Sequence, residues 1–227
     1  MSLKLRGVRT PGLLFFLLTI AIVPEFAAQN GLDVDGYDLS VYEGRPRIEA
    51  LRLNAGEAIN VDGVLSEAAW EHAIPASEFM QQDPDLGEPA TERTEVRILF
   101  TEDSLYIGVI CFDSNPGAIR GNTMQRDASL EADDRFRWTI DTYLDGRSGY
   151  LFEMNPSGAM RDTLMNSGGV SSMGGAQIGG ELAWDGIWSA NVQRSDIGWT
   201  IEIEIPFRTV NFDPDAPAWG INFQRTL

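Results

Sequence analysis

Apolar and polar residues alternate with a period of two through much of this chain, and that pattern constrains its fold more than any other feature. The clearest examples are Val96–Phe100, Phe136–Asp141, Tyr150–Asn155, Trp199–Phe207 and Trp219–Thr226. Successive side chains of a strand point to opposite sides, so this alternation is typical of strands with one buried face. Clusters of Gly, Pro, Asn and Asp separate the segments and predict turns.

These strands and turns predict an all-β domain. Short strands with almost no helical periodicity between them predict an antiparallel β-sandwich of the jelly-roll or immunoglobulin-like kind, with about nine strands. Leu105–Phe112 is apolar at nearly every position and is expected to be a central strand buried on both faces. Ile59–Gly63 is interpreted as a strand that ends in a turn, and Ser66–Trp70 as the start of a short helix whose Trp70 plugs the core.

The meander from Asp133 to Met165 has a polar face that is the first candidate for a binding surface. When its aromatic residues face the core, the opposite face carries Arg137, Thr139, Asp141, Glu153, Asn155, Arg161 and Thr163. Fork-shaped guanidinium groups and planar carboxylates suit a polyhydroxylated ligand, because they bind neighbouring hydroxyl groups in pairs. The alternative is a solvated outer face whose cross-strand ion pairs have no ligand.

The N-terminal residues predict export. Basic residues precede the apolar run Leu13–Val23, which is shorter than the about 20 residues of a membrane-spanning helix and fits the core of a signal peptide. Residues 1–28 are therefore expected to be a signal peptide and residues 29–45 a flexible acidic leader. Residues 46–227 are long enough for a single domain with one core.

Composition excludes several classes of function. The net charge of −17 disfavours partners that are nucleic acids or anionic lipid surfaces. Cys111 is the only cysteine, which rules out an intrachain disulfide and a cysteine-rich metal site. Outside the predicted signal peptide there is no lysine and one histidine, His72, expected at the edge of the core. Lysine Schiff-base chemistry is thereby excluded, and a histidine-dependent triad has a single candidate.

Seven phrases in a fixed order resemble a known family. They are INVDGVLSEAAW, PATERTEVRILF, LYIGVICFDSNP, DDRFRWTIDTYLDGRSGYLFEMNPSGAMRD, WDGIWSA, GWTIEIEIPF and WGINFQRT. Together they are similar to the N-terminal domain of exported bacterial proteins that contains a family-9-like carbohydrate-binding module, and the resemblance covers about 47–227.

This resemblance implies a jelly-roll-like sandwich, sugar binding, and an association with glycoside hydrolases and carbohydrate catabolism. It also implies a place in the periplasm, outer membrane or cell surface of a Gram-negative bacterium. Longer relatives continue into a C-terminal region that resembles an outer-membrane β-barrel, so the chain is expected to be an N-terminal part of such a protein. Arg137 and Glu153 stand where the family has Glu and Arg, so the pair is kept with its charges exchanged, and Asn155 matches in type.

The first functional hypothesis is therefore a carbohydrate-binding module. Its expected sugar contacts are Arg137, Asp141, Glu153, Asn155 and Arg161, with Trp184 as an aromatic platform.

Two alternatives stay open. The domain could be a periplasmic interaction or plug domain of a β-barrel protein, without sugar binding. It could also be a glycoside hydrolase component that cleaves O-glycosyl bonds with Glu202 and Glu204, which alternate on one strand at about 6.5–7 Å. Catalysis within this chain is not expected, because two glutamates on an alternating strand normally belong to its solvent-exposed face.

Structural calcium is a further expectation. The chain is rich in carboxylates, which are the ligands that calcium prefers. Asp133, Asp134, Asp141 and Asp145 are the densest group in the sequence and are the candidate metal ligands.

Overall fold

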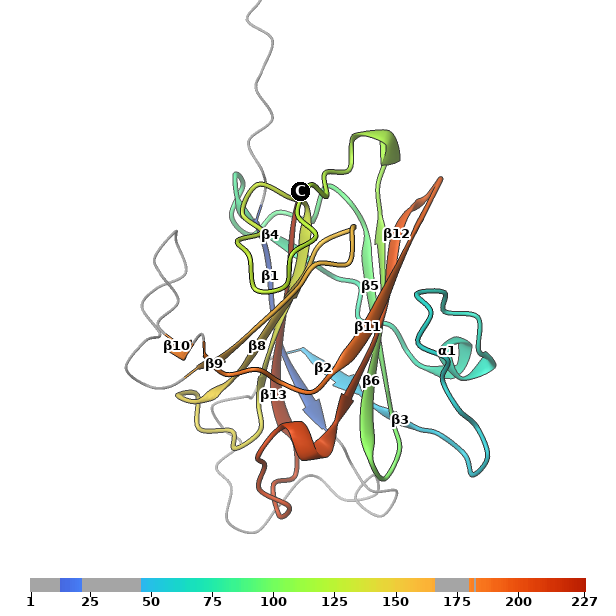
Figure 1. Cartoon of the computed structure of the whole chain (residues 1–227), viewed down its shortest axis with the longest axis vertical. Helices are drawn as coiled ribbons and strands as arrows, with labels where there is room; N and C mark the ends of the chain where they lie inside the picture. Colours follow the sequence, from blue (N-terminus) through green and yellow to red (C-terminus); the bar gives the residue numbers. More distant parts are fainter. Residues whose placement is uncertain (1–12, 22–45, 166–179, 182) are drawn as a thin grey trace, which may run out of the picture.

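The structure is a computed structural model that describes residues 13–21, 46–165, 180–181 and 183–227. Two sheets of mainly antiparallel strands face each other, so the predicted β-sandwich is confirmed (Figure 1). Most of residues 1–28 and all of residues 29–45 lie outside the described part of the chain, and their assignment as signal peptide and leader stays a prediction.

The larger sheet, sheet A, has eight strands. In spatial order they are β10 (Gly180–Glu181), β9 (Met160–Met165), β8 (Gly149–Met154), β7 (Arg135–Asp141), β13 (Trp219–Thr226), β1 (Leu13–Ala21) and β2 (Arg47–Glu49), with β4 (Met80–Asp83) paired to β1. The central meander of the sequence is thus β7, β8 and β9, three neighbouring antiparallel strands.

The smaller sheet, sheet B, has five strands. They are β11 (Ser189–Ser195), β12 (Gly198–Pro206), β6 (Ser104–Phe112), β5 (Thr94–Phe100) and β3 (Leu51–Arg52). Two short 3-10 helices (Pro116–Ala118 and Phe207–Thr209) and the helix α1 (Ala68–His72) complete the elements. Among the described residues, none of the helices has the length and hydrophobicity needed to span a bilayer.

Aromatic side chains fill the space between the sheets. Trp138 stacks on Phe152 with ring centroids 5.3 Å apart, and the edge of Trp188 meets Trp138 at 5.6 Å. All three residues are buried, as the alternation predicts for Trp138 and Phe152. Cys111 is a buried, free cysteine in the same core, and burial raises the pKa of its thiol to about 11.

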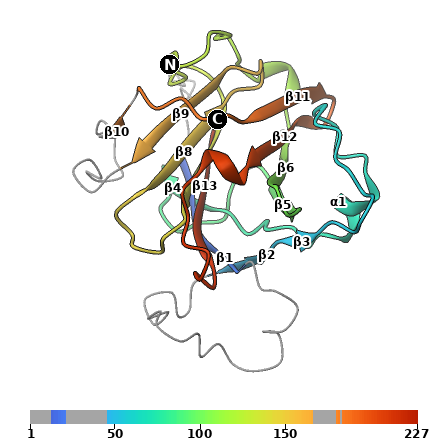
Figure 2. The ribbon, with the colours of Figure 1, turned by 60° about the horizontal axis from the view of Figure 1, so that its bottom comes forward.

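A second apolar cluster lies outside sheet B, where α1 and the segment before it cover the sheet (Figure 2). Trp70 is 2% exposed there and packs with Leu53 and Leu99, which confirms it as a plug. Gly108 of β6 makes room for the segment, because a Cβ at this position would lie 2.7 Å from Leu65 and 2.8 Å from Trp70.

Three details differ from the sequence-based prediction. The sheets contain more strands than the expected nine, and β1, β4 and β10 are among the strands that the alternation did not predict. Ile59–Gly63 is not a strand, since the N–H groups of Asp62 and Gly63 bind the carboxylate of Glu202 instead of a neighbouring strand. His72 is exposed at the end of α1.

Leu13–Ala21, predicted as the core of an export signal, forms β1 in this structure. Its backbone pairs antiparallel with β13 from Leu13↔Thr226 to Ile20↔Trp219. On its other side β1 pairs with β2 and β4. The segment therefore lies inside sheet A and not at its edge.

Candidate functional site

The candidate site lies on the face of sheet A that is turned away from sheet B. Its residues come from four adjacent strands and are held in register by the backbone ladders. Arg137 lies opposite Glu153 on β8 and opposite Gln224 on β13, and Glu153 lies opposite Arg161 on β9. We call this set, with Arg135, the arginine face: Arg135, Arg137, Glu153, Arg161 and Gln224.

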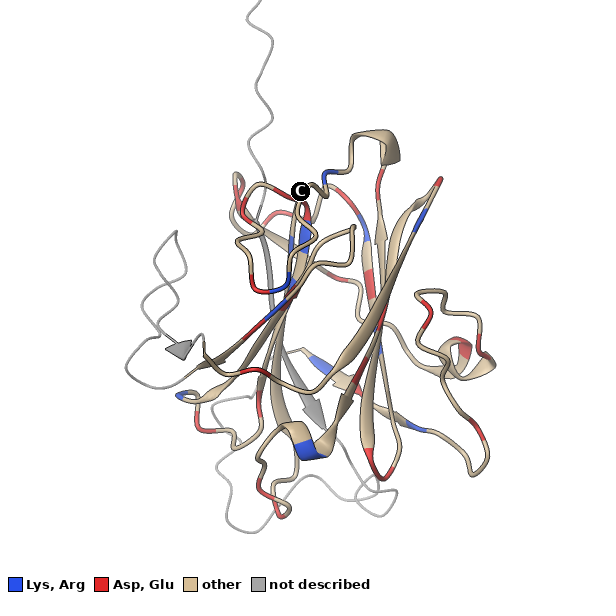
Figure 3. Ribbon diagram, viewed as in Figure 1, with Lys and Arg blue, Asp and Glu red and all other residues tan. Residues whose placement is uncertain are grey.

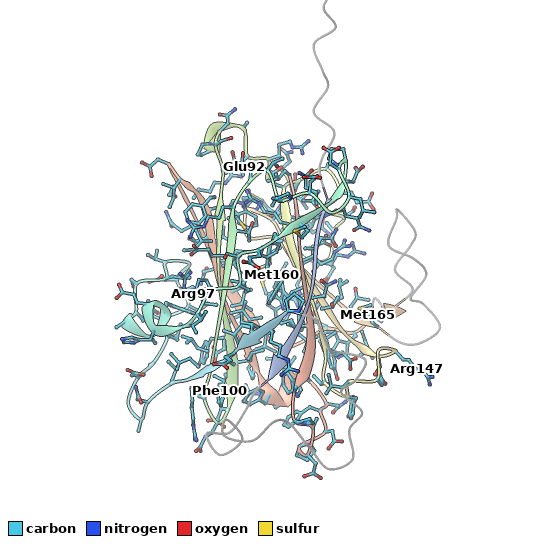
Figure 4. All side chains as sticks on the ribbon, turned by 180° about the vertical axis from the view of Figure 1, so that it is seen from behind. Glu92, Arg97, Phe100, Arg147, Met160 and Met165 are labelled. Carbon is cyan, nitrogen blue, oxygen red and sulfur yellow. The ribbon has the colours of Figure 1, made fainter. Side chains whose placement is uncertain are left out.

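Alternation explains why these residues share a face. Phe136, Trp138, Phe152 and Met154 point into the core between the sheets, so their neighbours along each strand point the other way. The labels in Figure 4 mark the two ends of β9 at Met160 and Met165. The sequence-based expectation that Arg137, Glu153 and Arg161 lie together is met by this geometry.

Glu153 is the centre of an ion-pair network. Its Oε1 lies 2.8 Å from Nη2 of Arg137 and 3.1 Å from Nε of Arg135, and its Oε2 lies 3.6 Å from Nη1 of Arg161. Gln224 accepts a long hydrogen bond of 3.5 Å from Arg137. One carboxylate thus faces three guanidinium groups.

The arginine face is less open than the sequence predicts. Glu153 has no solvent exposure, whereas the expected outer face would leave it in water. The side chains of Arg135, Arg137 and Arg161 are 11%, 18% and 27% exposed, so access improves toward Arg161. Burial lowers the pKa of Arg135, and repulsion from Arg137 adds to this effect, against the attraction of Glu153.

Several buried polar atoms on this face lack a hydrogen-bond partner within the described part of the chain. They are Nη1 of Arg135, Nε of Arg137, Oδ1 of Asn222 and Oγ1 of Thr226, and also Nε of Arg135 and Oε2 of Glu153, which take part only in the ion pairs given above. Asn222 and Thr226 lie on β13 at the register positions of Thr139 and Arg135. Buried polar groups in native proteins are nearly always paired, so this many unpaired atoms on one face require an explanation.

Asn155, another predicted sugar contact, is used by the protein itself. Its Nδ2 donates to the backbone oxygen of Thr123 and to Oδ2 of Asp133, and its Oδ1 accepts from the N–H groups of Ser157 and Ala159. Asn155 has no exposed surface. It fixes the β8–β9 turn against the loop that precedes β7.

Asp133 completes this anchor. It accepts hydrogen bonds from the N–H groups of Asn122 and Thr123 and from the amide of Asn155. Burial alone raises the pKa of Asp133, but these hydrogen bonds outweigh it and lower the pKa to about 2. Asp134 binds Arg120 instead, at 3.3 Å, and burial raises its pKa.

Asp141 and Asp145 build the turn between β7 and β8. Asp141 accepts hydrogen bonds from the N–H groups of Tyr143, Asp145 and Gly146. Asp145 binds the N–H groups of Arg147 and Ser148. Asp141 thus closes a turn at the end of the strand, and burial raises its pKa. Arg147 extends from the same turn (Figure 4).

The predicted four-aspartate metal site is wrong as a single site. Asp133 and Asp134 precede β7, whereas Asp141 ends it and Asp145 follows. Seven residues of extended strand separate the two pairs by roughly 20 Å. In the ranges that the structure describes, no group of three or more His, Cys, Asp or Glu side chains could hold a metal ion.

Trp184 lies on the other side of sheet A from the arginine face. Its ring is 5.0 Å from Tyr150 and 6.0 Å from Phe152, both of which point into the core. The structure therefore does not bring this predicted platform together with Arg137 and Glu153. It places Trp184 at the border of the core, where it is partly buried.

Glu202 and Glu204, the pair considered for hydrolysis, both serve the fold. Glu202 is fully buried and binds the backbone of Asp62 and Gly63 and Nε1 of Trp70, at 2.9 Å each. Burial raises the pKa of Glu202, against these hydrogen bonds. Glu204 accepts from the hydroxyl groups of Ser104 and Tyr106.

Sequence reasoning missed several members of the site and one further cluster. Arg135 has the same alternation as Arg137 and could have been included on that ground. Gln224 could not, because the sequence does not reveal that β13 pairs with β7. A buried carboxylate, Asp162, binds Arg126 and Nε1 of Trp188 at the border of the sandwich. The sequence could not reveal this cluster, because its partners come from distant segments.

Comparisons with known proteins give likenesses of structure and not of sequence. The structure is similar to carbohydrate-binding modules. Two are structures of a family 9 module from Caldicellulosiruptor kristjanssonii, in complex with glucose and with cellotriose. Both are 9% identical over 78% of this chain, at TM-scores of 0.48 (84% of that chain covered) and 0.49 (83% covered).

A third is a carbohydrate-binding protein, described as such only provisionally, from Bacteroides uniformis. It is 10% identical over 65% of this chain and 59% of its own, at a TM-score of 0.39. No family model matches the sequence, and no curated protein matches it. At such identities, what those proteins bind does not transfer to this chain.

Proposed function

We propose that this domain binds carbohydrate on the arginine face. The observation that carries the proposal is the cluster of three partly exposed guanidinium groups around the Glu153 carboxylate on β7, β8 and β9. A sugar hydroxyl both donates and accepts, so one ring can satisfy a guanidinium N–H and a carboxylate oxygen at the same time.

The ion-pair network prepares the face for such a ligand. Glu153 holds Arg135 and Arg137 from one side, so their planar groups are fixed before a ligand arrives. Fixed donors lose less conformational entropy on binding than free side chains do. The adjoining anchor of Asn155 and Asp133 fixes the β8–β9 turn beside them.

Affinity electrophoresis on a panel of soluble polysaccharides tests the proposal. We expect at least one polysaccharide to retard the protein, and Arg137→Gln to weaken that binding by about tenfold or more, as expected for the loss of a charged hydrogen bond. Arg147→Gln is the matched control, because Arg147 is exposed in the turn after β7. Circular dichroism verifies that each variant is folded.

Two results would overturn the proposal. One is a panel in which no polysaccharide retards the wild-type protein. The other is binding that Arg137→Gln and Arg161→Gln leave unchanged, since Arg161 is the most open of the three guanidinium groups.

The setting of this activity is also proposed. We infer that the protein is exported to the periplasm or outer membrane, acts with glycoside hydrolases in polysaccharide breakdown, and has a C-terminal β-barrel region as its partner. Support comes from the basic and apolar N-terminal residues and from the family-like phrases of the sequence. Expression in a Gram-negative host and sequencing of the N-terminus of the periplasmic product test export. Cleavage after Ala28 is expected, and an uncleaved cytoplasmic product would contradict it.

A further inference from the structure

We infer that the arginine face selects an acidic saccharide, a uronic acid that carries a carboxylate, over neutral sugars. The inference rests on the proposed carbohydrate binding and adds the class of sugar. It follows from the balance of charge on the face, from the free donors of the guanidinium groups, and from the charge of the rest of the molecule.

Positive charge exceeds negative charge on the face. Three arginines converge on one carboxylate, that of Glu153. Glu131 is the other acidic residue that acts on Arg135, and it is exposed, so water screens its charge. A neutral sugar would leave this excess uncompensated, whereas a carboxylate would neutralise part of it.

The remaining donors suit a carboxylate in geometry as well. Arg161 lies 3.6 Å from Glu153, and no hydrogen bond of its guanidinium group is found within the described ranges. The side chains of Arg135 and Arg137 are 11% and 18% exposed, so Arg161 is the most accessible of the three guanidinium groups. A guanidinium group binds a carboxylate through two parallel N–H donors, a match that an ammonium group cannot reproduce.

The charge of the whole protein makes this positive face unusual. The chain has a net charge of −17, and acidic residues are spread over the loops at both ends of the sandwich (Figure 3). Such a surface repels polyanions in general. A cluster of three arginines against that background therefore points to local recognition of an anion and not to nonspecific attraction.

The test uses the full chain and isothermal titration calorimetry with matched probes. Trimers of galacturonic, glucuronic and mannuronic acid are each compared with their own methyl ester, which has the same sugar without the charge. We expect at least one acid to bind about tenfold more tightly than its ester, and added salt to reduce this difference.

Variants of Arg161 test whether the preference for the acid over its ester arises at the arginine face. Arg161→Gln should weaken binding of the acid far more than binding of its ester, so that the two ligands bind about equally. Arg161→Lys should keep part of the preference for the acid, because the positive charge remains while the two parallel N–H donors of the guanidinium group are lost. Arg147→Gln, remote in the turn, should change nothing. Because Arg161 is partly exposed, its replacement is the least disruptive of the three arginines.

The outcomes separate the inference from the proposed function. If acids and esters bind equally, or if Arg161→Gln keeps the full preference, the inference is wrong while carbohydrate binding stands. If no acid, no ester and no neutral polysaccharide binds, both are wrong.

Discussion

Glu153 is a carboxylate without solvent exposure, and its negative charge compensates the positive charges of three guanidinium groups. Removing one partner of a buried ion pair costs more than the pair contributes, because the remaining charges stay buried without compensation. The residue is thus expected to matter for folding as well as for binding.

We predict that Glu153→Gln lowers the free energy of unfolding by about 3 kcal/mol. Three arginines would then repel one another with no negative group among them. Urea denaturation at neutral pH measures the change. Glu131→Gln is the control and should have little effect, because Glu131 is exposed; equal effects of the two variants would show that Glu153 has no special role.

The pH dependence of stability contains a contribution from Asp133. Its pKa is about 2 in the folded protein, against 3.8 for an ordinary aspartate. A lowered folded-state pKa stabilises the fold above pH 3.8, and this stabilisation is lost as the pH falls toward 2. The difference corresponds to about 2 kcal/mol.

We therefore predict that Asp133→Asn is less stable than the wild type near neutral pH, and that the gap narrows by about 2 kcal/mol between pH 4 and pH 2. Chemical denaturation across this pH range provides the measurement. A gap that stays constant with pH would mean that the hydrogen bonds of Asp133 do not favour its ionised form.

Among the elements, α1 and the segment before it depend on one small residue of sheet B. A methyl group on Gly108 would overlap the side chains of Leu65 and Trp70. Overpacking of this kind typically costs 1–3 kcal/mol. We predict that Gly108→Ala destabilises the protein by about 2 kcal/mol and speeds hydrogen exchange in residues 54–73.

Gly117→Ala is the matched control for Gly108→Ala. A Cβ at Gly117 would have only the Asn115 side chain nearby, at 3.9 Å. Its effect on stability is expected to stay within about 0.5 kcal/mol. Similar losses for both variants would indicate a general effect of replacing glycine and not a clash with α1.

The alternation of apolar and polar residues predicted the strands well where one face lies in the core and the other face is polar. It placed β5, β7, β8, β12 and β13 with their core residues. It failed at Ile59–Gly63, because a carboxylate from a distant strand, Glu202, takes the backbone donors that a strand would have used. No local pattern can reveal such a partner.

The candidate site shows the same limit. Arg137 and Glu153 were predictable as cross-strand neighbours, because only the short connection 142–148 joins their strands. Asn155 and Asp141 have the residue types of ligand contacts, but their hydrogen bonds are made to nearby turns. Trp184 is separated from the arginine face by the thickness of sheet A, and only the order of the strands in space shows this.

At the scale of the whole molecule, the sequence predicts the two sheets but does not predict that β1 pairs with β13 in sheet A. The sequence indicates that residues 1–28 are removed on export, whereas the structure places Leu13–Ala21 beside β13 over the length of that strand. Removal would leave unpaired the N–H and C=O groups of β13 that face β1, while those that face β7 stay paired, and unpaired strand edges promote association.

We predict that residues 29–227 alone self-associate more strongly than residues 1–227. Light scattering coupled to size-exclusion chromatography would detect the larger species as protein concentration rises. A monomeric 29–227 fragment with undiminished stability in urea would show that β13 needs no neighbour on that side.

The position of β1 has one more consequence for an exported protein. A segment cannot be discarded at the inner membrane and also remain a member of the folded sheet. If β1 is removed on export, the domain would have a gap in sheet A between β13 and the strands β2 and β4, which pair with β1. Such a gap between strands can accept an extended segment of another chain through backbone hydrogen bonds. The sheet would then be completed only after transport.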